Sequence, residues 1–410
     1  MSRRLSICYA APGHALPGTS GSARNVLSLA AALGRWSDVT VAFRSVREPF
    51  VPEGFDLIAI GPPTTDGAAV RDDVAFRGLD PRPHLSHLRA LERFAAASAG
   101  SFDVVLEKGW RLSGVLLAAF RRQGVPGVLI ECDVRHWAEA IGDLRTLIRY
   151  GLHGVTQLVS GVASRRVPRI IVETAELKAM LVERRGFAPE RLEVVGLGVD
   201  HARFRPLPQL AARESLGIER AARVLVYVGG MDVHHDLEPA IEGLARASLL
   251  SVELHLVGDG ERRPRYQALA AARRAPVRFH GQVPHSEVPT YIAAADACLA
   301  PYSVGAFPRG VVPFSTLKIP EYMACARPVI SVPSGHILRL VEDRRTGFLF
   351  ANEASAWAAF LNALPPREHL AAMGMAAAET VAPLSWERTA AGYLEVARQV
   401  IAAEASRGRP

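Results

Sequence analysis

Short hydrophobic runs alternate with longer amphipathic stretches through the first half of the chain. A helix is expected over Val26–Leu33, directly after the first of these runs. Strands that alternate with helices are typical of a parallel, doubly wound α/β sheet. The strands expected in this half are Leu5–Ala10, Val39–Phe43, Leu57–Ile60, Val104–Leu106, Val128–Ile130, Ile170–Val172 and Leu192–Val195.

A second series of the same kind follows the segment Asp200–Pro208, where two prolines interrupt the rhythm. Helices are expected over Leu237–Ala247, up to Arg274 and from Lys318. The expected strands are Val224–Val228, Glu253–Val257, Val277–Gly281, Ala297–Pro301, Val329–Val332 and Gly347–Phe350. The fold class is therefore α/β, with two facing Rossmann-like domains over residues 1–203 and 204–384 and a C-terminal helix, 385–410, that crosses back to the first. The carboxyl ends of the strands are where such sheets bind ligands.

The composition suits a protein of two or three domains, since 49% of the 410 residues are hydrophobic. Cys8, Cys132, Cys298 and Cys325 are far apart, so we expect reduced, buried thiols and no metal cluster. No signal-peptide core and no long uncharged apolar stretch is present. The sequence predicts a cytoplasmic protein that does not span a membrane.

The formal charge of +7 indicates an anionic partner: nucleic acid, a membrane surface or a phosphorylated small molecule. Nucleic acid is not expected, because aromatic residues are only 7% of the chain and no recognition motif is present. The densest basic zone, Arg145–Arg169, has two interpretations. It is a helix lying at a membrane interface, or a surface helix that packs its apolar side on its own domain, which is the more common arrangement.

Lys318 attracts attention because only Lys108, Lys178 and Lys318 are lysines among the 48 basic residues. Lysine offers a compact point charge where arginine offers a flat fork. In a helix Lys318 and Glu321 share one face near the start, where anions are attracted. Taken alone, this pair fits either a diphosphate site or a capped helix with two solvated charges.

Glycine-rich loops follow the first strand of each half, at Gly18–Gly21 and at Gly229–Gly230. Neither is a dinucleotide fingerprint or a Walker loop, but both can bring backbone close to an anion. His234 and His235, with Asp232 nearby, are interpreted as a polar turn and not as a metal site. No Asp-x-Asp pair occurs, so we expect Lys318, backbone amides and helix ends to meet the charge of a leaving diphosphate.

Several segments together resemble the retaining family-four glycosyltransferases of the GT-B fold. The pattern S-P-L-K-[LI]-x-E-Y-M-A-x-G-x-P-V-I is similar to Ser315–Ile330. The other similar segments are Gly229–Leu237, His280–Pro301 and Thr316–Phe350 in the donor half, and Pro17–Leu33 and Leu192–Asp200 in the acceptor half.

The resemblance implies that a hexosyl group moves from a nucleotide-diphosphate sugar, UDP by default, to a hydroxyl acceptor with retention and without a metal or other cofactor. In it Glu321 holds the donor ribose, while Lys318 and Gly229–Gly230 face the diphosphate and Gly21 approaches from the other domain. Further donor-side positions are expected at Val283, Thr316 and Leu317 and, from their position alone, at His234 and His235. Glu131 and Asp133 match the acceptor-facing strand end, where a salt-bridged terminus with Arg135 is the alternative.

The sequence departs from the family pattern at three positions. Pro313 stands where many relatives have a glutamate, Met231 or the following histidines replace an Arg or Lys, and Leu197 replaces an Asn. His234 or His235 is the candidate for the missing phosphate donor. Two rivals stay open: a nucleotide-sugar or glycan-binding protein without catalysis, and a sugar-nucleotide epimerase.

The acceptor is a glycan, a lipid-linked precursor or a small molecule, and the sequence does not choose among them. We expect the loops 62–82 and 135–149 to select it. Peripheral contact with the inner membrane face is part of the same expectation.

Overall fold

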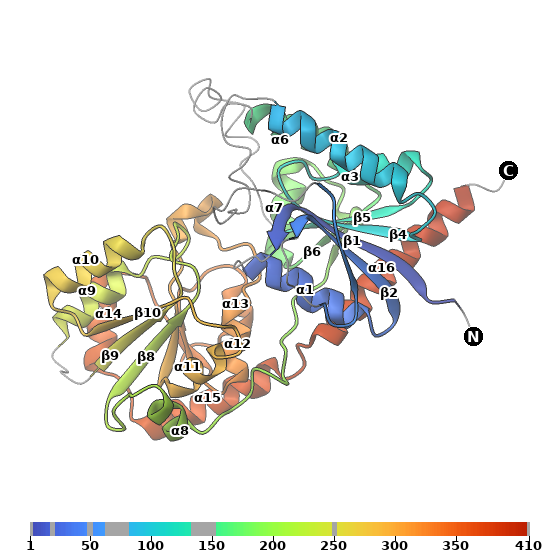
Figure 1. The fold of residues 1–410 in the computed structure, drawn as a ribbon. Coiled ribbons are helices and arrows are strands. Elements are labelled where there is room, and N and C mark those ends of the chain that lie inside the picture. The colour runs from blue at the N-terminus through green and yellow to red at the C-terminus, as the bar shows by residue number, and fades with distance from the viewer. Residues whose placement is uncertain are drawn as a thin grey trace. The chain divides into compact units, whose positions relative to one another are not determined.

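A computed structural model describes residues 3–16, 21–46, 52–61, 82–132, 153–247 and 252–407. The chain divides into two compact units (Figure 1). The first contains Met1–Leu197 and Trp386–Pro410, and the second contains Gly198–Ser385. Each unit is described by itself.

The first unit is built on a parallel sheet. Within the described residues it has seven strands in the order β3-β2-β1-β4-β5-β6-β7, as in a doubly wound fold. The strands are β1 (Leu5–Leu16), β2 (Ser37–Val46), β3 (Asp56–Ala59), β4 (Val104–Lys108), β5 (Gly127–Glu131), β6 (Arg169–Val172) and β7 (Leu192–Val194). All of the expected strands of this half are present.

Helices accompany this sheet, and the last of them comes from the C-terminus (Figure 1). They are α1 (Gly21–Leu33), α2 (Arg82–Ala97), α3 (Val115–Arg122), α6 (His153–Arg165), α7 (Ala175–Arg185) and α16 (Trp386–Arg407), with a 3₁₀ turn, η2 (Pro189–Arg191). Although α16 follows the second unit in the chain, it packs on α1, β5 and β6. The crossing C-terminal helix that the sequence predicts is therefore confirmed.

The first strand is longer than predicted. The hydrophobic run ends at Ala10, yet β1 continues to Leu16 because it keeps pairing with β2, as far as Leu16 opposite Val46. Nearly every residue of β1 is buried, so the small residues of its second half serve as strand. The Gly-rich loop does not follow Ala10 directly; its residues 18–20 lie outside the described part of the chain, and Gly21 begins α1.

The second unit repeats the plan. In its described residues a six-stranded parallel sheet has the order β10-β9-β8-β11-β12-β13. The strands are β8 (Arg223–Val228), β9 (Val252–Val257), β10 (Val277–Gly281), β11 (Ala297–Ala300), β12 (Val329–Ser331) and β13 (Gly347–Leu349). The helices are α8 (Gln209–Ser215), α9 (Glu238–Arg246), α10 (Arg263–Arg273), α11 (Val288–Ala294), α12 (Lys318–Ala324), α13 (Ile337–Leu340), α14 (Ala354–Asn362) and α15 (Arg367–Val381).

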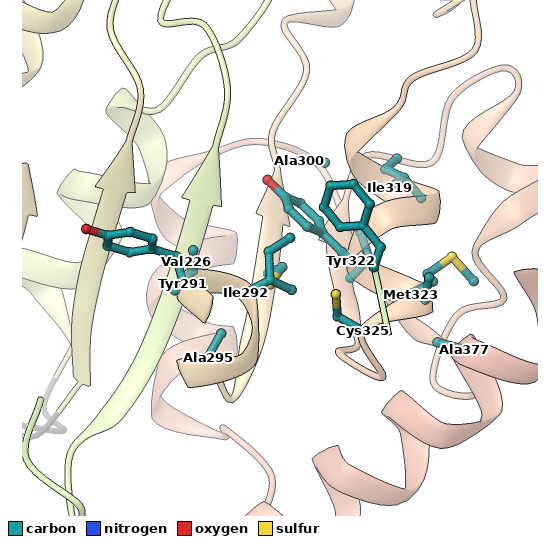
Figure 2. Packing of buried hydrophobic residues seen from close by; sticks show 14 of the residues in the cluster. Val226, Tyr291, Ile292, Ala295, Ala300, Ile319, Tyr322, Met323, Cys325 and Ala377 are labelled. Atoms are coloured by element: carbon teal, nitrogen blue, oxygen red, sulfur yellow. The ribbon is translucent and has the colours of Figure 1, made fainter. Parts of the chain in front are cut away.

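Two hydrophobic cores lie on opposite faces of this second sheet. One combines the sheet with α9, α10 and α14, and includes Tyr227 and Trp357. The other combines it with α8, α11, α12, α13 and α15. Figure 2 shows part of the latter, where Tyr322 and Met323 of α12 project from the helix that begins at Lys318. Burial of this face is what places Lys318 at the sheet.

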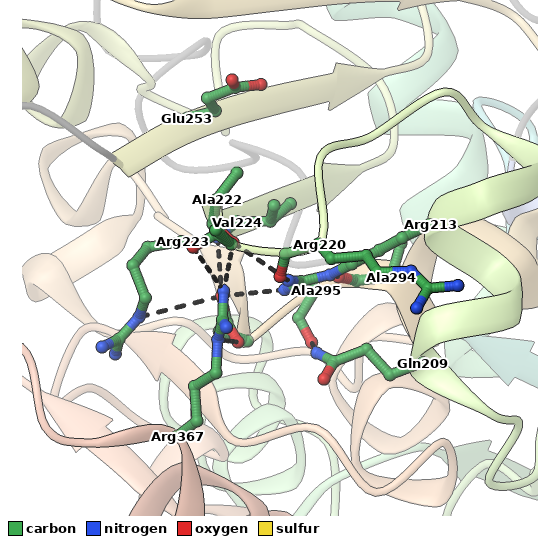
Figure 3. A network of polar contacts seen from close by, with 12 residues as sticks. Gln209, Arg213, Arg220, Ala222, Arg223, Val224, Glu253, Ala294, Ala295 and Arg367 are labelled. Carbon is green, nitrogen blue, oxygen red and sulfur yellow. Dashed lines mark hydrogen bonds and ion pairs between the residues drawn. The ribbon is translucent and has the colours of Figure 1, made fainter.

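A polar network fixes the amino ends of β8 and β11 (Figure 3). The buried carboxylate of Asp296 accepts from the Val224 amide at 2.7 Å and from the Arg213 guanidinium at 3.0 Å. Arg367, at the start of α15, donates to the same carboxylate at 3.2 Å. These bonds satisfy the buried charges, and the opposite, carboxyl ends of the strands carry the candidate site.

Candidate functional site

The loops after β8 and β9 touch backbone to backbone. A Cβ at Gly258 would lie 2.0 Å from the carbonyl oxygen of Gly229, and one at Gly260 would lie 2.3 Å from that of Met231. Both Gly229 and Gly258 have positive φ, 150° and 129°, which side chains rarely permit. The Gly229 amide donates to Val257 at 3.0 Å. The amide of Gly229 is therefore already hydrogen-bonded within the protein. What Gly229 offers to a ligand is a backbone without a side chain, which a ligand can approach closely.

The ammonium of Lys318 lies against this loop. It donates to the hydroxyl of Tyr227 at 3.3 Å and lies 4.8 Å and 5.4 Å from the ring centres of Tyr227 and Tyr302. A Cβ at Gly229 would be only 3.0 Å from Nζ. Because α12 has seven residues, Lys318 and not the helix dipole is the main positive charge here.

Burial lowers the pKa of Lys318 to about 7, although the carboxylates of Asp232 and Glu321 oppose the shift. A lysine in this environment changes its charge near neutral pH. An anion placed beside it would favour the protonated form. The alternative of a freely solvated lysine is wrong for Lys318, which is half-buried between two tyrosines.

Asp232 organises the two histidines differently. Its Oδ1 accepts from the His234 amide and lies 2.9 Å from His235 Nδ1. Burial alone would raise the pKa of Asp232, but the side chains of His234 and His235, together with the His234 amide, outweigh it and hold the pKa well below its usual range. Because an ionised carboxylate only accepts, Nδ1 of His235 carries the proton.

His235 is a neutral, anchored ring. Burial, and then the charge of Lys318, lower its pKa to about 4, and its ring lies 5.1 Å from that of Tyr302. His234 is more open: its side chain is 47% exposed and stacks at 5.3 Å on Phe307. Of the two, His234 is the one whose ring remains accessible to a ligand.

The other donor-side residues of the sequence prediction lie around the same strand ends. Thr316 is buried and Leu317 half-buried just before α12, and Glu321 is half-buried in its first turn. Val283 follows β10, half-buried against the core. Pro313 is buried in the segment that leads to α12.

The acceptor-side prediction rests on Glu131 and Asp133. Glu131 ends β5 and is buried in an ion pair with Arg185, with 3.1 Å between Oε2 and Nη1. The partner is therefore Arg185 of α7, while Arg135 and Asp133 lie outside the described residues, as do most of the loops 62–82 and 135–149. In the described structure, the ion pair of Glu131 therefore links β5 to α7.

A further lysine, Lys108, is buried at the end of β4, and the sequence pattern did not connect it with a site. Its side chain donates to Cys132 Sγ at 3.2 Å. Burial alone lowers its pKa, but Cys132, Tyr9 and Glu173 outweigh burial and raise the pKa above the ordinary value. The scarcity of lysine that marked Lys318 also marks Lys108. All four cysteines are free, and Cys132 is half-buried where the sequence predicted a buried thiol.

The comparisons with known proteins agree with this geometry. Residues 19–203 match the family Glycosyltransferase Family 4, and residues 222–364 match Glycosyl transferases group 1. The D-inositol 3-phosphate glycosyltransferase of Thermomonospora curvata is 31% identical over 336 residues, which cover 74% of this chain and 72% of that one. The chain belongs to glycosyltransferase family 4.

Solved structures show the same fold as this glycosyltransferase. Sucrose-phosphate synthase from Thermosynechococcus elongatus superposes with a TM-score of 0.77 at 20% identity, over 98% of this chain and 100% of that one. Anabaena HepE in complex with UDP-glucose gives 0.72 at 16% identity, over 96% and 100%. The predicted GT-B fold is confirmed, while the S-P-L-K subgroup stays a prediction.

Among the described residues, no group of three or more His, Cys, Asp or Glu side chains is placed to hold a metal ion. None of the helices in the same part of the chain is long and apolar enough to cross a membrane.

Proposed function

We propose that this glycosyltransferase moves a hexosyl group from a nucleotide-diphosphate sugar, UDP by default, to a hydroxyl acceptor, with retention at the anomeric carbon and without a metal. The observation that carries the proposal is the half-buried ammonium of Lys318 against the backbone of Gly229, at the carboxyl end of β8. The hydrogen bond that this ammonium donates goes to a neutral hydroxyl, so a charge-assisted bond to an anion would be the stronger interaction. The structure of Anabaena HepE with UDP-glucose supports the choice of donor.

Lys318 is assigned to the donor diphosphate. Its pKa near 7 rises when a diphosphate binds, so the enzyme takes up a proton together with the donor above neutral pH. The ammonium then faces the oxygens on which negative charge develops as the sugar leaves, which is the interaction that lowers a barrier most.

Glu321 is assigned to the ribose. It follows Lys318 by one turn on the same helix, and a carboxylate accepts from two neighbouring hydroxyls. Val283, Thr316 and Leu317 complete the donor side of the proposal, at the ends of the adjacent elements.

His234 is assigned as the additional donor to the diphosphate, in place of the cation that relatives have. Its ring is 47% exposed, with Nδ1 3.6 Å from Asp232 Oδ1, which supports this assignment. His235 is neutral, and its Nδ1 lies closer to the same oxygen, at 2.9 Å. His235 instead keeps the loop and Lys318 in place.

The acceptor is a glycan, a lipid-linked precursor or a small molecule that the enzyme meets in the cytoplasm, where free thiols persist. Because relatives are named D-inositol 3-phosphate glycosyltransferases, phosphorylated inositol is the first acceptor to test. Asp133 is proposed to orient the acceptor hydroxyl, and Glu131, through its ion pair with Arg185, to hold the end of β5, two residues earlier in the chain.

The experiment begins with a thermal-shift screen of UDP-, GDP-, dTDP- and ADP-sugars, since binding to the folded state raises its stability. The best donor is then incubated with inositol phosphate and other polyols, and products are analysed by mass and by the NMR coupling of the anomeric proton. A transferred hexose with retained configuration is expected. Lys318→Ala and Glu321→Ala should each reduce transfer by about 10²-fold.

Pro313 stands where many members of the family have a glutamate, and it is buried. This favours a second candidate, a nucleotide-sugar-binding protein without transfer. Tight donor binding with no product from any acceptor identifies that case. Conversion of the donor to its epimer without an acceptor identifies the epimerase. Equal turnover of the wild type and both variants contradicts the assignment of Lys318 and Glu321.

A further inference from the structure

Helix α6 buries small polar side chains and exposes aliphatic ones, which is the reverse of the usual arrangement. Its inward face is polar and small: Thr156, Ser160 and Ser164, spaced by four residues, are at most 5% exposed. Its outward face is aliphatic, with Val155, Leu158, Val159 and Val162 between 40% and 56% exposed. Surface helices of globular proteins normally bury the aliphatic stripe. The sequence-based interpretation that this segment packs its apolar side on its own domain is therefore wrong for these residues.

The close approach of α6 to α3 explains why the small residues face inward. At Gly114, before α3, a Cβ would lie 2.9 Å from the Ser164 amide nitrogen. Ser160 donates to the Ser113 carbonyl at 3.3 Å, and Arg185 donates to Ser164 Oγ at 3.2 Å. Large aliphatic side chains do not fit in this contact, so the stripe is left on the outside.

The outward face has the chemistry of a membrane-docking surface. The four exposed side chains form a contiguous apolar stripe, and the largest apolar patch of a soluble protein is often functional. The helix contains no acidic residue and ends in exposed Arg165, followed by exposed Arg166, whose carbonyl accepts from Arg121 of α3. Aliphatic side chains beside a cluster of arginines complement the acyl chains and the negative headgroups of an anionic bilayer.

We infer that the outward face of α6 docks this enzyme on an anionic membrane surface. Four half-exposed aliphatic side chains offer on the order of 300–400 Å², at most half of the about 800 Å² per partner that a stable protein interface buries. A second copy of the chain is thus the weaker match, whereas a shallow helix with a few aliphatic residues and basic neighbours is sufficient at a lipid interface. The inference does not depend on the donor site in the second unit.

The test is flotation of the full-length protein with vesicles of phosphatidylcholine alone or mixed with phosphatidylglycerol. We expect flotation with the anionic vesicles, less with neutral ones, and partial release by 0.5 M NaCl. The variant Val155→Ser/Leu158→Ser/Val162→Ser should lower partitioning about tenfold or more. The matched control Leu210→Ser/Met375→Ser removes equally exposed aliphatic side chains from the second unit and should float like the wild type.

A charge variant, Arg165→Glu/Arg166→Glu, separates the electrostatic contribution to binding from the aliphatic one. It should abolish the preference for anionic vesicles. Flotation that is unchanged in the aliphatic variant, or equally reduced in the control, overturns the inference. So does a concentration-dependent dimer that the aliphatic variant dissociates, because the face then binds a second copy. A lower melting temperature of the aliphatic variant without loss of flotation would show that another segment of the chain covers the face.

Discussion

The hydroxyl of Tyr322 bonds to both backbone groups of one residue, Val228. It donates to the carbonyl oxygen at 3.0 Å and accepts from the amide at 2.7 Å. Since Val228 is the last residue of β8 and Tyr322 lies in α12, this pair attaches the helix that bears Lys318 to the strand that precedes Gly229. The proposed donor site depends on this attachment.

Tyr322→Phe removes both bonds and leaves two backbone groups of Val228 without this partner. We expect a loss of about 1–3 kcal/mol in the free energy of unfolding, measured in urea, and weaker donor binding because Lys318 is less well positioned. Tyr9→Phe is the matched control, since the buried Tyr9 hydroxyl has no hydrogen-bond partner in the described structure. Equal destabilisation by both variants would show that the hydroxyl bonds of Tyr322 are not the cause.

The affinity for UDP-glucose should depend on pH through Lys318. Its pKa near 7 in the free enzyme means that the ammonium is progressively lost above pH 7, while the anionic donor requires it. The dissociation constant should rise by up to about tenfold per pH unit above pH 7, until the pKa of the bound form is reached. Titration calorimetry from pH 6 to 9 measures this. In Lys318→Arg, which stays charged, the curve should be flat, and a slope that persists there would assign the effect to another group.

Without a ligand, the contribution of Lys318 to the free energy of unfolding should become more favourable as pH rises, whereas donor affinity should fall. The folded-state pKa of Lys318 is below its unfolded value, so folding disfavours the proton, and this cost is full below pH 7 and disappears as pH rises toward 10.5. Lys318→Met should therefore be more stable than the wild type at pH 6, with a difference that shrinks by pH 9. Urea unfolding at both pH values tests this, and a difference that grows with pH would contradict the shift.

Replacing His234 should mainly affect transfer, whereas replacing His235 should also affect stability. His234→Ala removes an exposed ring, so transfer should fall while the melting temperature changes little. His235→Ala leaves the ionised Asp232 without its 2.9 Å partner in the loop, so stability should fall by about 1–3 kcal/mol and donor binding with it. Thermal unfolding and initial rates measure the two quantities. The reverse pattern would exchange the roles of the histidines.

Gly258→Ala should disrupt the loop contact, because the new Cβ would lie 2.0 Å from the Gly229 carbonyl. Backbone must move, and donor affinity should fall at least about tenfold together with stability. Gly217→Ala is the control: φ is also positive there, but no atom lies within 4 Å of the new Cβ. It should cost only about 1 kcal/mol of backbone strain and leave donor affinity unchanged.

Much of this architecture can be predicted from local sequence patterns. Strands recognised as short apolar runs lie within a few residues of their predicted ends, because parallel strands buried on both faces need continuous hydrophobic residues. The exception, β1, runs on to Leu16 by pairing with β2, and no local pattern records that pairing. Lys318 and Glu321 start a helix as predicted, since Pro320 is tolerated only in a first turn.

The sequence alone determined the alternation of strands and helices, the glycines at the strand ends and the single lysine at the start of α12. Tertiary structure decided the properties of these residues. Tyr227 and Tyr302, which are far from Lys318 in the chain, lie against its ammonium, and burial lowers its pKa. Arg185 forms an ion pair with Glu131. The close approach at Gly114 determines which face of α6 turns inward. The reason is that burial and charge environment arise from contacts between distant residues, whereas periodicity and turn chemistry are carried by neighbours.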